Sequence, residues 1–476
     1  MNAAKPLAPA LLCTLLATAC GGSSAAGETS PLEDMAARLH THVAKVWPHT
    51  GRIWPGADYS RNVLLITDGR AAYAVDTAGH REVPLADLTA SGIEVPAYER
   101  GFDAITWKGR RGIVVRPQMT VKADAEDPTG FDSGDAALRT FGLATHEQFH
   151  SYVQQDAKGD PAWASLPALA DRAGGVDDRA QHYPTEVEPR SYRTMVYNSL
   201  LAAYQDPQRR RDHLAAAAYW QQTWARTYPN EAKSQPLLDT MEGSARYVES
   251  MAVAMATVED PRDREQIRTR LTGTLRPLKS VNKGFEPYAI GATALFTADA
   301  MSLDARKRIT EEPVTPQQVV LRGVKPVRQT LPADVRRALT ANAARADKKI
   351  APDIEPFVAG MRDKKKWVLL VPQSAAKGTL GGTGFYTTDQ LPLTIIAKAR
   401  LSFALDGGGS LSVNGRTVAE VPLEGELYYG TPLDPADPDV SLKGDRLVLK
   451  SPELKGEFTV RSETDDGQRV LYARTP

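Results

Sequence analysis

The spacing of apolar residues predicts a helix at the start of the folded chain and strands directly after it. Leu32, Met35, Leu39 and Val43 recur at intervals of three and four residues, which favours one apolar helix face over residues 31–46. Short apolar runs then predict strands at 63–67, 71–75, 104–107 and 112–115. An Asp-Gly turn between the first two strands predicts a hairpin.

Helical periodicity dominates the middle of the chain, to about residue 310. Ser133 or Asp135 is expected to cap the first of these helices, which continues through Leu138, Phe141 and Phe149. Further helices are predicted at 190–204, 209–228, 237–258, 263–275 and 287–303. An acidic loop at 124–135 precedes them. Its spacing does not fit an EF-hand, so a solvated loop is favoured over a calcium loop.

Prolines and a second change of pattern mark the last third of the chain. Four prolines and little periodicity between residues 311 and 332 predict a linker at 313–332. A helix is predicted at 333–366, followed by strands at 367–372, 393–397, 401–405, 411–413, 417–421, 446–449, 457–460 and 470–472. Gly and Pro-Asp turns separate these strands, which is typical of a β-sandwich or barrel.

The expected fold class is therefore α+β and multidomain. A small β-rich part with one helix occupies residues 31–123, and a mainly helical domain occupies 124–312. After the linker at 313–332, residues 333–476 are expected to form a short helical segment and a C-terminal β-sandwich or barrel.

The first 30 residues are expected to lie outside the fold. An apolar run after Lys5 is too short to span a bilayer and ends in small residues, which is typical of a secretory signal peptide. The triplet before Cys20 resembles the bacterial lipoprotein signal, which implies a signal peptide at 1–19 and a lipid on Cys20. Simple secretion is the alternative. With a lipid on Cys20, residues 20–30 would be a flexible tether between the anchor and the fold. The resemblance then implies a lipid-anchored protein of the cell envelope, at the outer membrane or facing the periplasm.

Composition adds three constraints. Lys plus Arg equals Asp plus Glu at 58 each, so no excess of positive charge favours a nucleic-acid partner. The two cysteines lie in the signal region, so neither a disulfide nor a zinc thiolate is expected in the mature fold. No later stretch is apolar for long enough to form a transmembrane helix, so the expected membrane contact is the N-terminal lipid.

Residues 146–150, His-Glu-Gln-Phe-His, carry the clearest indication of chemistry. Residues four apart share one face of a helix, so His146 and His150 can bind one zinc ion with Glu147 beside the remaining coordination position. Zinc lowers the pKa of a bound water, and a carboxylate can take the proton and pass it to a leaving amine. The motif therefore indicates a zinc hydrolase.

A catalytic zinc site uses three protein ligands, so one more ligand is expected. The candidates are His182, His213, Glu231, Glu242 and Glu249. Glu242 is favoured because it borders the apolar face of a predicted helix, where a buried carboxylate needs a partner. A donor for the developing oxyanion is also needed, and the available residue types are Tyr288, Tyr247, Arg246 and His213.

The HExxH helix, followed by a second helix that reads Glu-Gly-x-Ala-x-Tyr from Glu242, resembles the gluzincin metallopeptidases. The resemblance implies a zincin-like catalytic domain with His146, His150 and Glu242 as zinc ligands and Glu147 as general base. It also implies a peptide or protein substrate. Tyr288 resembles the tyrosine that some gluzincins place over the metal. The chain departs from the family pattern in its interval of 92 residues between His150 and Glu242 and in Arg246, where an Asp is usual.

The expected function is an exported zinc-dependent metallohydrolase, a peptidase that cleaves peptide bonds with a zinc-activated water. The alternative is a non-catalytic binding lipoprotein at the surface or in the periplasm, with a structural zinc ion. Glu147 favours the enzyme, because a structural zinc site does not need a general base.

Overall fold

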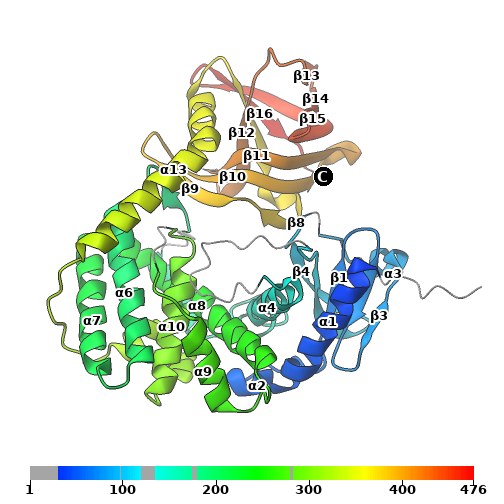
Figure 1. Cartoon of the computed structure of the whole chain (residues 1–476). Coiled ribbons are helices and arrows are strands. Elements are labelled where there is room, and N and C mark those ends of the chain that lie inside the picture. Colours follow the sequence, from blue (N-terminus) through cyan, green and yellow to red (C-terminus); the bar gives the residue numbers. More distant parts are fainter. Residues whose placement is uncertain (1–29, 97, 120–133, 174–178, 279–281, 476) are drawn as a thin grey trace, which may run out of the picture.

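Figure 1 shows the computed structural model of the chain, which describes residues 30–96, 98–119, 134–173, 179–278 and 282–475. A small sheet lies in the N-terminal part, helices fill the middle of the chain, and a larger sheet forms the C-terminal part. This segregation of helices and strands confirms the α+β class. No helix in the described ranges is both long and apolar enough to cross a membrane.

The N-terminal elements follow the predicted pattern closely. Helix α1 (Pro31–Val46) begins at Ser30, whose hydroxyl accepts a hydrogen bond from the Glu33 N–H at 3.1 Å. The strands β1 (Val63–Thr67) and β2 (Ala72–Val75) form the expected antiparallel hairpin. The sheet order is β3–β2–β1–β5–β4, and the remaining elements are η1 (Trp47–His49), α2 (Thr50–Ile53), β3 (His80–Glu82), β4 (Phe102–Trp107) and β5 (Arg110–Val115).

One face of this sheet shares its core with the helices. Strand β1 is buried along its whole length. Leu64 and Ile66 pack in one cluster with α1 and the helices of the middle region, whereas Val63 and Leu65 pack toward α3 (Leu85–Ala90). Alternate residues of a strand point to opposite faces, so β1 contributes to both cores. The parts expected at 31–123 and 124–312 therefore share one hydrophobic core.

The middle of the chain is helical, as predicted. Asp135 caps α4, because its carboxylate accepts hydrogen bonds from the N–H groups of Ala137 and Leu138. Helix α8 begins at Pro229 rather than near Leu237 and keeps Pro236 in its interior, a position where proline usually breaks a helix. The helices are α4 (Ala136–Phe149), α5 (Ser165–Ala173), α6 (Val187–Gln205), α7 (Arg210–Thr227), α8 (Pro229–Thr257), α9 (Arg264–Thr274), α10 (Glu286–Ala300) and α11 (Ala305–Glu311).

Helices α8 and α10 cross at two glycines. A Cβ on Gly243 would lie 2.5 Å from the Gly291 Cα, and a Cβ on Gly291 would lie 2.1 Å from the Asp239 carbonyl oxygen. Two helix backbones approach this closely only where side chains are absent. The crossing therefore fixes the start of α10, which carries Tyr288, against the part of α8 that carries Glu242.

The stretch expected as a linker, 313–332, contains a packed helix. Helix α12 (Pro316–Val320) begins with a capping box between Thr315 and Gln318, and proline is favourable in its first turn. The buried Gln317 donates a hydrogen bond to Asp239 on α8. This part of the stretch therefore belongs to the helical core, which its proline-rich composition did not indicate.

The C-terminal region consists of α13 (Ala333–Arg362) and a sheet. Strands β10 and β11 each unite two predicted strands. β10 runs through a bulge between Ile396 and Ala399, where Lys398 has a φ of 49°. The pairings β15–β16–β7–β12–β11–β15 close a ring. The elements are β7 (Trp367–Pro372), η3 (Gln373–Ala375), β8 (Ala376–Gly381), β9 (Gly384–Thr388), β10 (Leu391–Ala404), η4 (Asp406–Gly408), β11 (Ser410–Leu423), β12 (Glu426–Leu433), β13 (Val440–Lys443), β14 (Arg446–Lys450), β15 (Leu454–Asp465) and β16 (Gln468–Ala473).

The helical region contributes one strand to this sheet. Strand β6 (Gln181–His182) lies between α5 and α6 in the sequence and pairs in parallel with β9. Helix α13 lies across the sheet on the side of the helices and also contacts α6 (Figure 1). We call α13 and β7–β16, residues 333–475, the C-terminal β domain.

The helix crossing predicts the effect of a small substitution. Gly291→Ala should lower the free energy of unfolding by about 1–3 kcal/mol, because its methyl group would overlap the Asp239 carbonyl oxygen. In Gly273→Ala, the control on α9, nothing lies within 4 Å of the new Cβ, so stability should be unchanged or rise by up to about 1 kcal/mol. Urea unfolding measures both variants, and a wild-type midpoint for Gly291→Ala would contradict the close crossing.

Candidate metal centre

The two histidines of the HExxH motif lie where an α-helix passes into a π-helical turn. Helix α4 ends at Phe149, and η2 (His150–Gln154) continues it as one π-helical turn. His146 is therefore in the last turn of α4, and His150 is the first residue of η2. Single π-helical turns within α-helices are frequent at functional sites.

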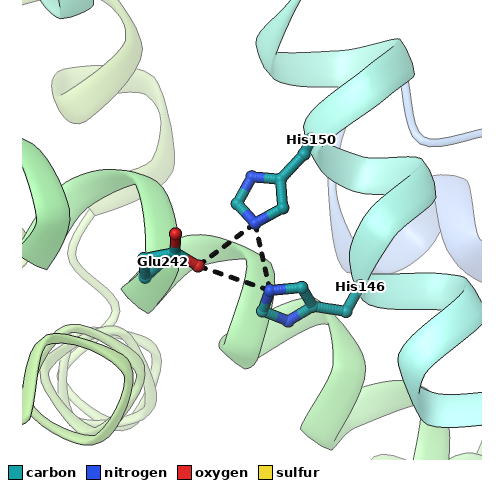
Figure 2. A group of neighbouring side chains, drawn as sticks. All are labelled: His146, His150 and Glu242. Carbon is teal, nitrogen blue, oxygen red and sulfur yellow. Dashed lines mark hydrogen bonds and ion pairs between the residues drawn. The ribbon is translucent and has the colours of Figure 1, made fainter. Parts of the chain in front are cut away.

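Three side-chain atoms of this region converge on one point (Figure 2). His150 Nε2 lies 3.0 Å from His146 Nε2 and 3.2 Å from Glu242 Oε2, and His146 Nε2 lies 3.4 Å from the same oxygen. Two ligands of a tetrahedral zinc ion, each at about 2.0–2.1 Å from it, lie about 3.3 Å apart. The triangle therefore fits one metal ion. Among the described residues, His146, His150 and Glu242 are the group of His, Cys, Asp or Glu side chains that lie close enough together to hold a metal ion.

Gln154 fixes the ring of His150. The Gln154 amide nitrogen donates to the Met241 carbonyl oxygen at 2.8 Å and to Ser244 Oγ at 2.9 Å. Its Oε1 must therefore be the atom that faces His150 Nδ1 at 2.5 Å. An amide oxygen only accepts, so Nδ1 of His150 carries the proton and Nε2 of the neutral ring has a free lone pair.

Glu249 has the same role toward His146. Its Oε2 lies 3.0 Å from His146 Nδ1, and its Oε1 accepts from Arg246 Nη1 at 2.6 Å. A carboxylate accepts, so Nδ1 of His146 donates and Nε2 points toward the triangle. Such carboxylate–histidine pairs orient metal-binding imidazoles in zinc proteins.

The orientation of the two rings brings like electrostatic potentials together. Without a proton or a metal ion, two imidazole lone pairs and one carboxylate oxygen would meet within the triangle, and His146 and Glu242 are buried. This arrangement is repulsive unless a cation lies between the three atoms. The cation can be a metal ion or a proton, and the donor set of two imidazoles and one carboxylate suits a transition metal.

The carboxylates around the triangle have different proton affinities. Burial alone would raise the pKa of Glu242, but His150, His146 and Arg179 hold it well below its usual value. Burial would also raise the pKa of Glu249, yet Arg246 and His146 lower it to about 2. Burial does raise the pKa of Glu147, and the nearby His146 and His150 offset this rise only in part. Divergent pKa values in one site are typical of carboxylates with different tasks.

Glu147 differs from the other two carboxylates in its contacts as well. It follows His146 directly on α4 and is half-buried. No described residue donates a hydrogen bond to its side chain, whereas Glu242 and Glu249 are both fully engaged. Glu147 is therefore the carboxylate beside the triangle that is able to accept a proton from another molecule.

Tyr288 reaches the triangle from α10. Its ring stacks on His146 with a centroid separation of 5.7 Å and an interplanar angle of 16°. Burial raises the pKa of Tyr288 well above its usual value, and the charge of Glu242 and a hydrogen bond to it act in the same direction. The hydroxyl therefore stays protonated at neutral pH and remains a hydrogen-bond donor.

Arg179 reaches the triangle from the segment before β6. Its Nη2 lies 2.9 Å from Glu242 Oε1, the carboxylate oxygen that does not face the histidines. The Arg179 side chain is 34% exposed, while that of Glu242 is 4% exposed. One oxygen of the Glu242 carboxylate thus faces the metal position, and the other pairs with the partly exposed Arg179.

The other residues considered as ligands or oxyanion donors lie elsewhere. Glu231 pairs with Arg190, His182 with Asp389 at 3.1 Å, and His213 with Asp206 at 3.7 Å. The hydroxyl of Tyr247 hydrogen-bonds to Asp299. Of the expected site residues, the structure therefore brings together His146, Glu147, His150, Glu242 and Tyr288, with Glu249 and Arg246 beside them.

Sequence reasoning missed Gln154 and Arg179 and misjudged Glu249. Gln154 follows His150 by four residues, and Glu249 follows Glu242 by seven, so both spacings could have indicated a shared helix face. No local signal marks Arg179, because its position depends on contacts with distant parts of the chain. Cys20 and most of the acidic loop at 124–135 lie outside the described residues, so the lipid anchor and the solvated loop stay predictions.

Comparisons of the chain with protein-family models, with curated proteins and with solved structures gave no match. The chemistry of the protein must therefore be inferred from its own residues. These residues form a buried His-His-Glu group that could hold a metal ion.

The proton affinity of the site predicts how metal binding depends on pH. Burial alone would lower the pKa of His146, but hydrogen bonds to Glu242 and Glu249 raise it to about 10, so the metal-free site holds a proton at neutral pH. A metal ion must displace this proton to reach Nε2. The apparent association constant for Zn²⁺ should therefore rise with pH near neutrality, by up to about tenfold per pH unit, with release of one proton.

Calorimetric titration with Zn²⁺ in buffers of different ionisation enthalpy measures the affinity and the proton release together. His146→Ala should abolish tight binding. His213→Ala, which removes a histidine outside the triangle, should bind Zn²⁺ like the wild type. An affinity that does not change with pH would contradict the protonated metal-free site.

Proposed function

We propose that this protein is a zinc-dependent hydrolase that cleaves peptide bonds. The observation that carries the proposal is the contrast between Glu147 and its neighbours. Glu242 faces the metal position and Glu249 orients a histidine, whereas the half-buried carboxylate of Glu147 receives no hydrogen bond from the described residues. A carboxylate held in this way beside a metal position has the environment of a general base.

The donor set supports zinc as the metal. Two imidazoles and one glutamate are the ligands of a well-known class of catalytic zinc sites, which keep a fourth position open. The described residues supply three such ligands and no fourth, so the geometry favours an open site over the closed site of a structural zinc ion. When bound, zinc would supply a Lewis acid that activates water and polarises a carbonyl group.

Glu147 moves the proton in this proposal. Its carboxylate accepts the proton of the attacking water and then donates it to the nitrogen of the leaving amine. Because burial raises the pKa of Glu147, the carboxylate binds this proton more tightly than an exposed glutamate would. It follows His146 directly on α4, and it lies close enough to His146 and His150 for both to lower its pKa.

Tyr288 is the proposed donor to the developing oxyanion. Its ring is fixed against His146, and burial raises the pKa of its hydroxyl well above the usual value, so the hydroxyl stays protonated. A hydroxyl at this position can donate to a substrate oxygen that binds beside the ligands. Tyr247, His213 and Arg246 are engaged with Asp299, Asp206 and Glu249, which leaves Tyr288 as the best-placed of the four candidate donors.

The peptide bond as substrate rests on the resemblance to gluzincins in the two helices that carry the HExxH and Glu-Gly-x-Ala-x-Tyr sequences. Those two helices are α4 and α8, which pack together and bring Glu242 to the histidines. The location at the cell envelope, with a lipid on Cys20, is proposed from residues 1–30. The substrate would then be a peptide or protein outside the cytoplasm.

Two substitutions separate the tasks of the two glutamates. Glu147→Gln keeps the size of the side chain but removes the base, so zinc should stay bound and hydrolysis should fall by about 10²-fold or more. Glu242→Gln removes the charged ligand, so the affinity for zinc itself should fall. Peptide-library cleavage and elemental analysis of the same preparations measure both effects.

Chelation of the wild type gives the matching control. Removal of zinc should abolish cleavage, and addition of zinc should restore it in the wild type but not in Glu147→Gln. Hydrolysis that survives Glu147→Gln would exclude this mechanism, and full zinc retention in Glu242→Gln would show that the third ligand is misassigned.

A further inference from the structure

The two oxygens of the Glu242 carboxylate have separate partners. Oε2 lies 3.2 and 3.4 Å from the Nε2 atoms of His150 and His146, and Oε1 lies 2.9 Å from Arg179 Nη2. Since a guanidinium binds carboxylate oxygens strongly, Arg179 keeps Oε1 turned away from the two histidines. Glu242 can then offer one oxygen to a metal ion, and the position that its second oxygen would fill stays open.

The segment that carries Arg179 is attached to the C-terminal β domain along its length. Gln181 and His182 form β6 and pair with Tyr386 and Thr387 of β9. The Tyr183 N–H donates to the Thr387 carbonyl oxygen at 2.8 Å. The backbone just after Arg179 is therefore part of the C-terminal sheet.

Helix α13 holds the same segment by side chains. The Tyr183 hydroxyl donates to Glu355 Oε1 at 2.6 Å. Thr185 donates to the Asp347 carboxylate through its N–H at 3.1 Å and through its hydroxyl at 2.6 Å. The segment from Arg179 to Thr185 therefore connects Glu242, through its contact with Arg179, to two elements of the C-terminal β domain.

We propose that Arg179 is a positioning residue that keeps Glu242 bound through one oxygen, and that the C-terminal β domain holds Arg179 in place. The proposal rests on the proposed function and gives the C-terminal β domain a role in it. The domain would then act on the open position at the metal through Arg179. Arg179 itself touches neither substrate nor reacting atoms in this role.

The proposal predicts that the loss of Arg179 lowers hydrolysis but does not lower the affinity for Zn²⁺. Without Arg179, both oxygens of Glu242 can bind the ion, and a cation that repels the ion is also gone. Arg179→Ala should therefore bind Zn²⁺ at least as tightly as the wild type, while hydrolysis falls by about tenfold or more. A variant that merely disturbed the fold would lose both. Arg179→Lys keeps the charge and should recover part of the activity.

Bound Co²⁺ provides a readout that does not depend on hydrolysis. Co²⁺ can replace zinc in such sites, and its visible absorption is stronger with four ligands than with five. Arg179→Ala should therefore show weaker absorption per bound Co²⁺ than the wild type. If the wild type cleaves no peptide, the proposed function fails, but the Co²⁺ spectrum and the Zn²⁺ affinity still test the role of Arg179.

Asp347→Ala tests the role of the C-terminal β domain, because it releases Thr185 without touching the site. It should show the same pattern as Arg179→Ala in weaker form, with hydrolysis lower by about threefold to tenfold and Zn²⁺ binding no weaker. Asp353→Ala is the matched control. Asp353 also lies on α13, but it pairs with Lys398 at 3.2 Å within the C-terminal β domain, so both readouts should match the wild type.

The double variant decides whether the two residues act together. Asp347→Ala should have little further effect in the Arg179→Ala background, because the residue that it helps to hold is already absent. Weaker Zn²⁺ binding or an unchanged Co²⁺ spectrum in Arg179→Ala would overturn the role of Arg179. Wild-type behaviour of Asp347→Ala, or fully additive effects in the double variant, would overturn the role of the C-terminal β domain.

Discussion

The electrostatic repulsion that three acceptor atoms would have without a cation between them is the constraint on which the centre of this structure depends. Two imidazole nitrogens and a carboxylate oxygen lie 3.0–3.4 Å apart, and both imidazoles are turned so that their Nε2 atoms face each other. Only a cation makes this arrangement favourable. Gln154 and Glu249 hold the rings in it, and Arg179 balances part of the charge on Glu242. These three polar side chains therefore keep the ligand atoms of His146, His150 and Glu242 in place.

Buried charge also fixes the helices that carry the centre. Arg193 on α6 lies between Asp239 on α8 and Glu286 on α10, and Arg190 joins Glu286 to Glu231. Removal of one partner would leave a buried charge uncompensated, so such pairs hold their helices in one arrangement. Glu286 stands two residues before Tyr288, and Asp239 stands three residues before Glu242. The ion pairs and the glycine crossing thus set the distance between the tyrosine and the ligands.

The sequence was informative where the physical signal is local. The spacing of His146 and His150 shows their shared helix face, and α1, β1 and the hairpin followed directly from apolar periodicity. Glu242 was favoured because it borders the apolar face of its predicted helix, and the resemblance to gluzincins pointed to the same residue. Gln154 was missed although it follows His150 by four residues, a spacing that could have indicated a shared helix face. Arg179 could not be predicted, because only the pairing of β6 with β9 places it.

The pairing of β6 with β9 has a consequence for the order in which the chain matures. His182 and its partner Asp389 are 207 residues apart, so the ribosome completes all three candidate ligands long before β9 exists. During that interval β6 has no neighbouring strand, and the arginine beside it has no fixed place. Parts of a chain generally fold as they emerge, with the N-terminal part first. The ligands can therefore assemble early, while the surroundings of Glu242 become complete only when the last domain has folded.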